Sequence, residues 1–308
     1  MPTRIFIDGA AGTTGLEIRE RLAPRKEFEL LVLDDARRKD EAARREAMHD
    51  VDIAILCLPD DAAREAVALA QGSKTRIIDA SSAHRTAPGW TYGFPELIGQ
   101  DDITKARRVS NPGCYPTGFL ALVAPLVRAG ILPADWPFTV NAVSGYSGGG
   151  KALIERFEGE PDLGFRTYGL NLSHKHAPEM KLHAGLEREV IFAPAVVPVY
   201  RGMIVEVPLH LGAMPLNPTA DQLRGELRDH YAGSNVVTVM DNNDAGELTL
   251  KENATPFDGM ELYVFGNESG DHARLVARLD NLGKGASGEA IQNLNLMCGL
   301  PESAGLRL

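Results

Sequence analysis

The chain opens with the stretch that decides its fold, IFIDGAAGTTG at residues 5–15. An apolar run predicts a first strand over residues 4–8, and residues 16–22 have the spacing of a helix. Glycines between a first strand and a first helix let the backbone approach a pyrophosphate at the helix N-terminus, although any tight turn also uses glycine. We therefore expect a dinucleotide to bind to a set of residues in this loop: Gly9, Gly12, Thr13, Thr14 and Gly15.

Three more strand-like runs follow at residues 28–33, 51–58 and 75–79, and a helical pattern at residues 59–70 separates the last two. The run at residues 51–58 is apolar almost throughout, which is typical of a strand in a parallel sheet that is covered on both faces. Strands that alternate with helical segments predict an α/β protein with a doubly wound parallel sheet. Ligands of such sheets bind at the carboxyl ends of the strands.

Charges of both signs follow the second strand. Asp34 lies about 20 residues beyond Gly15, where an acidic side chain binds the ribose 2′-hydroxyl of NAD. Arg37, Arg38 and Lys39 come directly afterwards and suit the 2′-phosphate of NADP instead. The residues leave both coenzymes open, beside a third interpretation in which the charges belong to a solvated loop.

The strand at residues 75–79 ends in DASSAHR, residues 79–85. Arg85 has a planar guanidinium that can clamp a phosphate or a carboxylate through two parallel hydrogen bonds. A surface arginine in a loop is the alternative interpretation. We expect this loop to contribute Arg85 to a substrate site and Ser81 to the coenzyme site.

A second informative stretch is SNPGCYPT at residues 110–117. A strand ends at its Pro-Gly break, and the apolar run from Gly118 predicts a buried helix, so Cys114 lies at a helix N-terminus. Unpaired N–H groups and the positive end of the helix dipole favour a thiolate there, which is a nucleophile. A small cysteine buried in a tight turn is the alternative. We expect Cys114 to be the nucleophile.

Two histidines occur in NLSHKHAPE, residues 171–179, where Pro178 suits the first turn of a helix running through Leu186. His176 therefore precedes that helix, and we expect it to act as a general acid–base because histidine titrates near neutral pH. His174 is the second choice. A polar structural histidine is the alternative interpretation. A metal pair is disfavoured, because no matching third ligand set appears.

A glycine-rich segment, SGYSGGGK at residues 144–151, follows a predicted strand at residues 138–143. It differs from a phosphate-binding P-loop because Ala152, not serine or threonine, follows Lys151, which excludes ATP binding by that motif. Further on, residues 196–207 have the pattern of strand, turn and strand, with Arg201 expected to face a pocket. A helix at residues 220–231 and strands at residues 261–265 and 273–277 come next.

Length and composition restrict the class of protein. The 308 residues suggest two domains, and 44% hydrophobic with 24% charged residues is ordinary for a globular protein. A net charge of −10 argues against nucleic acid as a partner, and no apolar run reaches the roughly 18 residues of a membrane span. Cysteines at positions 57, 114 and 298 form no disulfide or metal-finger pattern, and no signal peptide is evident. We expect a cytoplasmic protein without a metal site.

The stretch SNPGCYPT resembles the active-site signature of the N-acetyl-gamma-glutamyl-phosphate reductases of arginine biosynthesis. The resemblance extends along the whole chain, and the length of the chain indicates the shorter of that family's two types. The resemblance implies NADPH-dependent reduction of N-acetyl-gamma-glutamyl phosphate through a thioester on Cys114, with His176 handling the proton. Semialdehyde dehydrogenases of the same chemistry, acting on aspartate or on carrier-bound aminoadipate, are the nearest alternatives. A regulator that only senses NADP is a more distant one.

The resemblance also implies an organisation. Residues 1–113 form the dinucleotide-binding domain, the C-terminal helix at residues 283–308 packs back on it, and residues 114–282 form an α+β catalytic domain like that of glyceraldehyde-phosphate dehydrogenase. A homo-oligomer, dimer or tetramer, is implied. Substrate-binding residues implied by the resemblance are Arg85, Asn111, Tyr146, Ser147, Lys151 and Arg201. Coenzyme-binding residues beyond the first glycine loop are Arg37, Arg38, Ser81, Gly285 and Asn293.

Overall fold

The computed structural model describes residues 1–241 and 246–308. The chain folds into two compact units. Residues 1–113 and 286–306 form unit 1, and residues 114–285 with 307–308 form unit 2.

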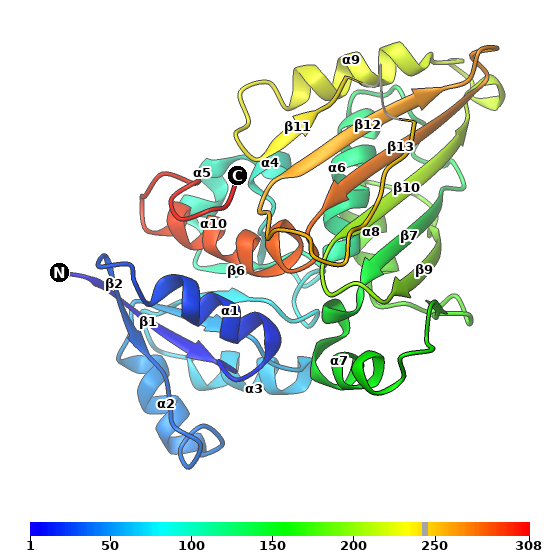
Figure 1. Ribbon diagram of the computed structural model, residues 1–308. Coiled ribbons are helices and arrows are strands. Elements are labelled where there is room, and N and C mark those ends of the chain that lie inside the picture. Colours follow the sequence, from blue (N-terminus) through cyan, green and yellow to red (C-terminus); the bar gives the residue numbers. More distant parts are fainter. Residues whose placement is uncertain (242–245) are drawn as a thin grey trace. The chain divides into compact units, whose positions relative to one another are not determined.

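Unit 1 is built on a six-stranded sheet of order β2-β1-β3-β4-β6-β5, and every strand pair is parallel (Figure 1). This confirms the predicted doubly wound sheet. The strands are β1 (Thr3–Asp8), β2 (Phe28–Leu31), β3 (Ile53–Leu56), β4 (Arg76–Asp79), β5 (Thr91–Tyr92) and β6 (Arg108–Ser110). The helices are α1 (Thr13–Leu22), α2 (Glu41–His49), α3 (Asp60–Leu69), α4 (Pro95–Ile98), α5 (Gln100–Lys105) and α10 (Gly288–Met297).

Apolar side chains cover both faces of this sheet. One cluster joins β1, β3 and β4 to α1, α5 and α10, and the other joins the strands to α2 and α3. Ile55 and Leu56 are neighbours in β3 and fall in different clusters, because successive side chains of a strand point to opposite faces. The nearly continuous apolar run of β3 therefore follows from burial on both sides.

The last helix of unit 1 is shorter than the predicted helix at residues 283–308. A π-helical turn at Gly283–Ser287 precedes α10, which ends at Met297. Gly299 has a φ of 69°, which is outside helical geometry, and Pro301 has no N–H group to donate. These two residues therefore end the helix. All ten residues of α10 are buried.

Unit 2 contains a seven-stranded mixed sheet of order β11-β12-β13-β10-β7-β9-β8 (Figure 1). The pairs β7–β9 and β11–β12 are parallel and the other paired strands are antiparallel, which confirms the predicted α+β architecture. The strands are β7 (Thr139–Gly145), β8 (Arg166–Thr167), β9 (Ile191–Val197), β10 (Met203–His210), β11 (Val237–Val239), β12 (Met260–Gly266) and β13 (His272–Leu279).

Helices α6 (Cys114–Arg128), α7 (Gly150–Gly159), α8 (Ala177–Ala184) and α9 (Ala220–His230) belong to unit 2, with 3₁₀ turns at Tyr146–Gly149 and Leu211–Ala213. Helix α6 packs on β10 and β13. A Cβ atom at Gly118 would lie 2.8 Å from a methyl carbon of Val205, so glycine permits this close packing. The start of α6 is thereby held at a defined place on the sheet.

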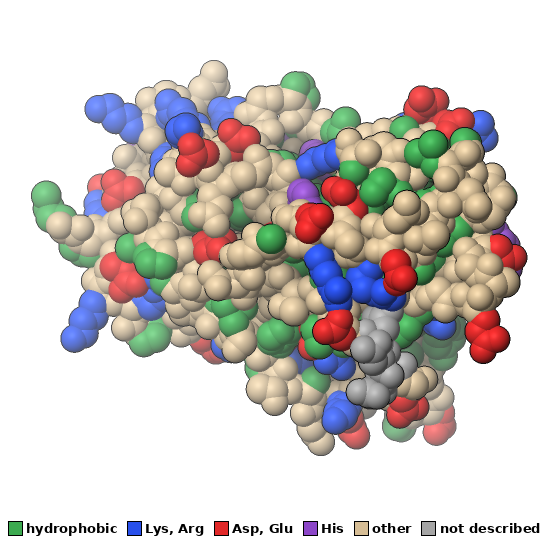
Figure 2. All heavy atoms as spheres, turned by 90° about the horizontal axis from the view of Figure 1, so that it is seen from above, with side chains coloured by type: hydrophobic (Ala, Val, Ile, Leu, Met, Phe, Trp, Pro, Cys, Tyr) green, Lys and Arg blue, Asp and Glu red, His purple; other side chains and the backbone are tan. Residues whose placement is uncertain are grey.

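Within the described parts of the chain, no helix combines the length and the apolar character that crossing a membrane requires. On the face drawn in Figure 2, acidic and basic side chains lie interspersed among hydrophobic ones.

Candidate active site

Strand β6 ends at Ser110 and α6 begins at Cys114, which confirms the predicted strand followed by a helix. The Cys114 thiol lies half-buried at the positive end of a 15-residue helix, the position that favours a thiolate. A Cβ atom at Gly285 would lie 2.8 Å from the Cβ of Cys114, so the absence of a side chain at Gly285 permits the close approach of its backbone.

His176 lies at the N-cap of α8, as the sequence predicts, and is 7% exposed. The helix ends earlier than predicted, at Ala184, where Gly185 adopts a left-handed conformation. Tyr115 follows Cys114 in α6, and its ring lies 5.9 Å from the His176 ring between centroids. Helices α6 and α8 pack together, so unit 2 brings the predicted nucleophile helix and the predicted acid–base residue into one region.

A cluster of aromatic rings includes Tyr115 and continues through His176 to His174. The hydroxyl of Tyr115 donates to the Ala195 carbonyl at 3.0 Å, and Phe192 packs edge-on against Tyr115. Burial raises the pKa of Tyr168 to about 12 and raises the pKa of Tyr115, so both hydroxyls keep their protons near neutral pH. Sequence reasoning missed Tyr168 and Phe192, since no motif includes them and folding brings their rings against His174.

The predicted substrate loop around residue 146 lies in unit 2. Tyr146 stacks on Phe157 and contacts Tyr200 edge-on. Ser147 is buried and its hydroxyl accepts from the Asn281 amide at 2.9 Å. Arg201 makes an ion pair of 2.8 Å with Asp280. Tyr146, Ser147 and Arg201 are thus drawn together, because the loop's N–H groups bond to the carbonyl oxygens of residues 199 and 200.

Lys151 is exposed at the start of α7.

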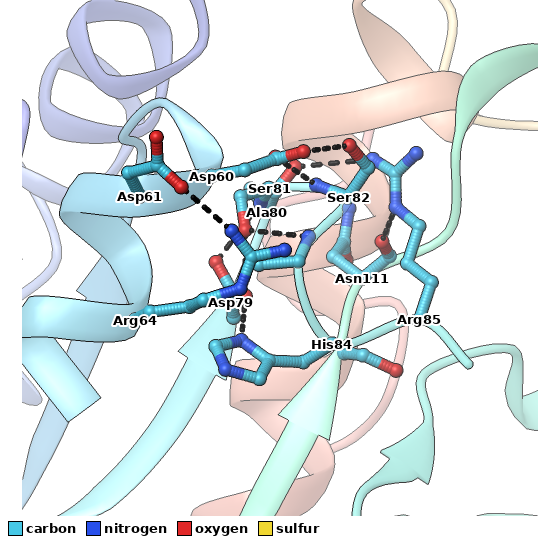
Figure 3. Close-up of polar contacts among 12 residues, drawn as sticks. Asp60, Asp61, Arg64, Asp79, Ala80, Ser81, Ser82, His84, Arg85 and Asn111 are labelled. Carbon is cyan, nitrogen blue, oxygen red and sulfur yellow. Dashed lines mark hydrogen bonds and ion pairs between the residues drawn. The ribbon is translucent and has the colours of Figure 1, made fainter. Parts of the chain in front are cut away.

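The loop after β4 is organised by Asp79, which is fully buried (Figure 3). Its carboxylate accepts from the backbone N–H and the hydroxyl of Ser81, and from Nδ1 of His84 at 2.6 Å. His84 in turn stacks on Trp90 with ring centroids 4.2 Å apart. The predicted coenzyme residue Ser81 is therefore held by Asp79, a contact that sequence reasoning did not identify.

Three predicted site residues of unit 1 form one hydrogen-bonded network, part of which appears in Figure 3. Arg85 donates through Nε to the carbonyl oxygen of Asn111 at 3.0 Å. The Asn293 amide donates to the Asn111 side chain and to the carbonyl of Gly93. A Cβ atom at Gly93 would lie 2.5 Å from the Asn293 amide nitrogen, so this contact needs glycine. The network fixes the backbone three residues before Cys114.

The first glycine loop has the form that a dinucleotide requires. Gly9 has a φ of 89°, and a Cβ atom there would overlap the carbonyl oxygen of Cys57. A Cβ atom at Gly15 would overlap the carbonyl oxygen of Gly9. Gly12 caps α1, and Thr13 and Thr14 form its first turn, half-buried. Backbone N–H groups at this helix start fit a pyrophosphate.

A cavity of about 710 Å³ adjoins this loop in unit 1. Arg38 and Lys39 line it together with Asp34, while Arg37 lies outside the lining and pairs with Glu46 at 2.9 Å. Other residues of the wall include Asp8, Gly9, Asp35, Arg44, Leu58 and Glu65. The cavity volume and its mixed lining fit the adenosine part of a dinucleotide.

Two contacts in this region lie beyond sequence reasoning. Asp34 accepts the backbone N–H groups of Ala36 and Arg37, so its carboxylate shapes the turn that carries the basic residues. Arg44, from α2, binds Oδ2 of Asp8 through Nε and Nη2 at 3.1 and 2.9 Å, and both side chains are at least nine-tenths buried. Burial raises the pKa of Asp8 although the Arg44 guanidinium opposes that shift.

Comparison with known proteins agrees with this architecture. The sequence model described as the semialdehyde dehydrogenase NAD binding domain matches residues 4–106, and the one described as the semialdehyde dehydrogenase dimerisation domain matches residues 114–281. Aspartate semialdehyde dehydrogenase II from Vibrio cholerae superposes with a TM-score of 0.73 over 97% of this chain and 99% of its own, at 17% identity. The enzyme from Candida albicans, solved with NADP, superposes with a TM-score of 0.67 at 15% identity, over 97% and 99% of the two chains.

The fold and the two matched domains define the class, a two-domain protein of the semialdehyde dehydrogenase type. N-acetyl-gamma-glutamyl-phosphate reductase 2 from Nostoc is 50% identical, covering 98% of this chain and 99% of its own. The reductase from Rhizobium meliloti is 51% identical over 96% and 99%, and that from Brucella ovis 51% over 97% and 100%. The chain therefore belongs to the family of N-acetyl-gamma-glutamyl-phosphate reductases, which confirms the resemblance of its cysteine motif.

Proposed function

We propose that the protein reduces N-acetyl-gamma-glutamyl phosphate to N-acetylglutamate semialdehyde with NADPH, a step of arginine biosynthesis. One observation carries this proposal: Cys114 opens α6 and His176 caps α8 in the same unit, next to Tyr115, in a chain about half identical to reductases named for that substrate.

The chemistry begins with the Cys114 thiolate, which attacks the carbonyl carbon of the acyl phosphate. The bond from that carbon to the phosphate oxygen breaks, inorganic phosphate leaves, and a thioester remains on sulfur. Bound NADPH supplies the hydride that reduces this thioester. His176 gives a proton to the oxygen that carries the developing negative charge and takes it back as the carbon–sulfur bond breaks. The aldehyde leaves and the thiolate of Cys114 is restored.

We assign coenzyme binding to unit 1. The loop from Gly9 to Gly15 holds the pyrophosphate, and Arg38 with Lys39 on the cavity wall favours NADPH over NADH. Arg37 adds to this positive charge from outside the wall. Ser81, Gly285 and Asn293 complete the proposed coenzyme site, with the geometry of Ser81 and Asn293 supported by their bonds to Asp79 and Gly93.

We assign the substrate to Arg85 and Asn111 in unit 1 and to Tyr146, Ser147, Lys151 and Arg201 in unit 2. The cationic groups suit the two negative ends of the acyl phosphate. Residues 1–113 with α10 thus act as the nucleotide domain and residues 114–282 as the catalytic domain. We further propose a homo-oligomer, supported by the matched dimerisation domain, and a cytoplasmic location, supported by three cysteines that form no disulfide.

The direct experiment runs the reaction backwards. Purified protein, inorganic phosphate and NADP are mixed with N-acetylglutamate semialdehyde or with aspartate semialdehyde, and nicotinamide reduction is followed by absorbance. We expect rapid reduction with the acetylated aldehyde, strict dependence on phosphate, and none with Cys114→Ser. A higher kcat/KM for aspartate semialdehyde would contradict the proposed substrate and favour the alternative enzyme of the same fold.

A further inference from the structure

The backbone that carries His176 is bound by a neighbouring histidine. The N–H of His176 donates to Nδ1 of His174 at 3.2 Å, and the N–H of Ala177 donates to the His174 carbonyl at 3.0 Å. The first N–H groups of a helix have no partner inside the helix and must find one elsewhere. His174 therefore caps α8 twice, once with its ring and once with its backbone.

This bond determines where the His174 ring carries its proton. A nitrogen that accepts an N–H cannot itself hold a hydrogen, so Nδ1 is bare and the neutral ring is protonated at Nε2. Burial, followed by the charge of Lys175, lowers the pKa of His174, which agrees with a neutral ring. Protonation at Nδ1 would break the cap, so the ring is poorly suited to act as the base itself.

The ring of His174 is also held on its other sides. Its centroid lies 5.5 Å from the Tyr168 ring, 5.0 Å from the Phe192 ring and 4.8 Å from the His176 ring, at interplanar angles of 63°, 79° and 63°. Phe192 belongs to β9, and Tyr168 follows β8. The cap is therefore anchored to the edge of the mixed sheet.

We propose that His174 is a positioning residue, whose Nδ1 acceptor holds the backbone of His176 and so orients the His176 imidazole for proton transfer. The proton transfer that this orientation serves rests on the proposed function, whereas the cap itself rests on the geometry alone. A role as the base, or as an aromatic packing group only, makes different predictions.

Two variants separate these roles. His174→Asn removes the ring but keeps an oxygen acceptor near the position of Nδ1, whereas His174→Phe keeps a ring and removes the acceptor. We expect kcat of the Asn variant to stay within about tenfold of the wild type and kcat of the Phe variant to fall about 10²-fold, since small misplacements of a catalytic group cost about that much. KM for the aldehyde should change little in either.

Other outcomes would overturn the proposal. A Phe variant at least as active as the Asn variant would assign His174 to packing. If both variants lost as much kcat as His176→Asn does, His174 would be a base. In the His176→Asn background, His174→Phe should add less than about threefold, because a residue acting through His176 has nothing left to position. A further full loss there contradicts the proposal. If the Phe variant fails to fold, His174→Leu takes its place.

Hydrogen exchange tests the cap without any substrate. The peptide spanning residues 171–180 should exchange faster in His174→Phe than in the wild type or His174→Asn, because only the Phe variant leaves the His176 N–H without its acceptor. Equal exchange in all three would overturn the cap. If the wild type turns over neither aldehyde, the proposed function fails while this measurement still decides the role of His174.

Discussion

Cys57 and Cys114 both follow strands of the same parallel sheet, but they lie in different surroundings. Cys57 lies beyond β3, where burial and the nearby carboxylates of Asp79 and Asp8 raise its pKa to about 12. Cys114 begins a 15-residue helix whose dipole favours the thiolate. The surroundings of a cysteine in space, and not its place after a strand, therefore decide how readily its thiol ionises.

The histidines of the two units repeat this contrast. His84, in unit 1, is bound through Nδ1 to the buried carboxylate of Asp79 and stacks on Trp90, so its ring organises a loop. His176, in unit 2, stands at a helix start beside Tyr115. The histidine of unit 1 is thus fixed by an acid and a ring, whereas the proposed reactive groups of unit 2, Cys114 and His176, both lie at helix N-termini.

The largest expected effect distinguishes Cys114 from Cys57. Cys114→Ser should abolish turnover, because a serine hydroxyl is far less ionised than a thiol and its ester is reduced poorly. Cys57→Ser should keep most of it. With acyl phosphate and no nucleotide, a single-turnover experiment on the wild type should release about one phosphate per active site and leave an acyl group on the Cys114 peptide, detected by mass. Label on Cys57 or Cys298 would contradict the assignment.

The next effect separates the two histidines. His176→Asn should lower kcat by about 10²- to 10⁴-fold while nucleotide binding and folding remain, which is the usual contribution of general acid–base catalysis. His84→Asn is the matched control and should cost less than about tenfold. Steady-state kinetics with both variants check this. An equal loss in the two would mean that the acid-bound histidine of unit 1 takes part in the chemistry.

Much of the fold was predictable, because backbone requirements leave local marks. The glycines at positions 9 and 15, the apolar run of β3 and the Pro-Gly break before Cys114 each reflect a steric or burial condition within a few residues. The length of the last helix was predicted wrongly. Its apolar composition continues past Met297, and the left-handed backbone at Gly299 decides where it ends.

The supporting contacts of the site were not predictable in this way. Arg44 reaches Asp8 from 36 residues away, and Asn293 reaches Gly93 from 200 residues away. Tyr168 contacts His174 where the chain leaves β8, which is paired with β9. Arg44 and Asn293 reach their partners from elements far away in the sequence, so those pairings exist only in the folded chain. Residue type and spacing identify candidate reactive groups, whereas the groups that orient them depend on topology.

A smaller effect tests whether charge in unit 1 selects the coenzyme. The double change Arg38→Ala and Lys39→Ala should raise KM for NADPH about tenfold, because exposed charge pairs contribute at most about 1 kcal/mol each. KM for NADH should stay nearly unchanged, because NADH lacks the 2′-phosphate that these side chains are proposed to bind. Arg37→Ala is the matched control and should have a weaker effect, since Arg37 lies outside the cavity wall and pairs with Glu46. Equal effects on both coenzymes would indicate that the basic residues belong to a solvated loop. Asp34 would then favour NAD as the coenzyme.

The smallest effect concerns stability and sharpens the comparison of the cysteines. At pH 7, Cys57→Ala should lower the stability of unit 1 by about 1 kcal/mol, the cost of a small cavity where this partly buried side chain packs against the core, without changing KM or kcat. Because burial raises the folded pKa of Cys57 from its ordinary value to about 12, the neutral thiol stabilises the folded state fully below the unfolded pKa. That stabilisation is lost as the pH rises from the unfolded value toward 12, so the difference between wild type and variant should shrink there. Urea midpoints between pH 7 and pH 11, read from Trp90 fluorescence in a Trp136→Phe background, measure it. A difference that grows with pH would show that Cys57 ionises readily and that the contrast with Cys114 is wrong.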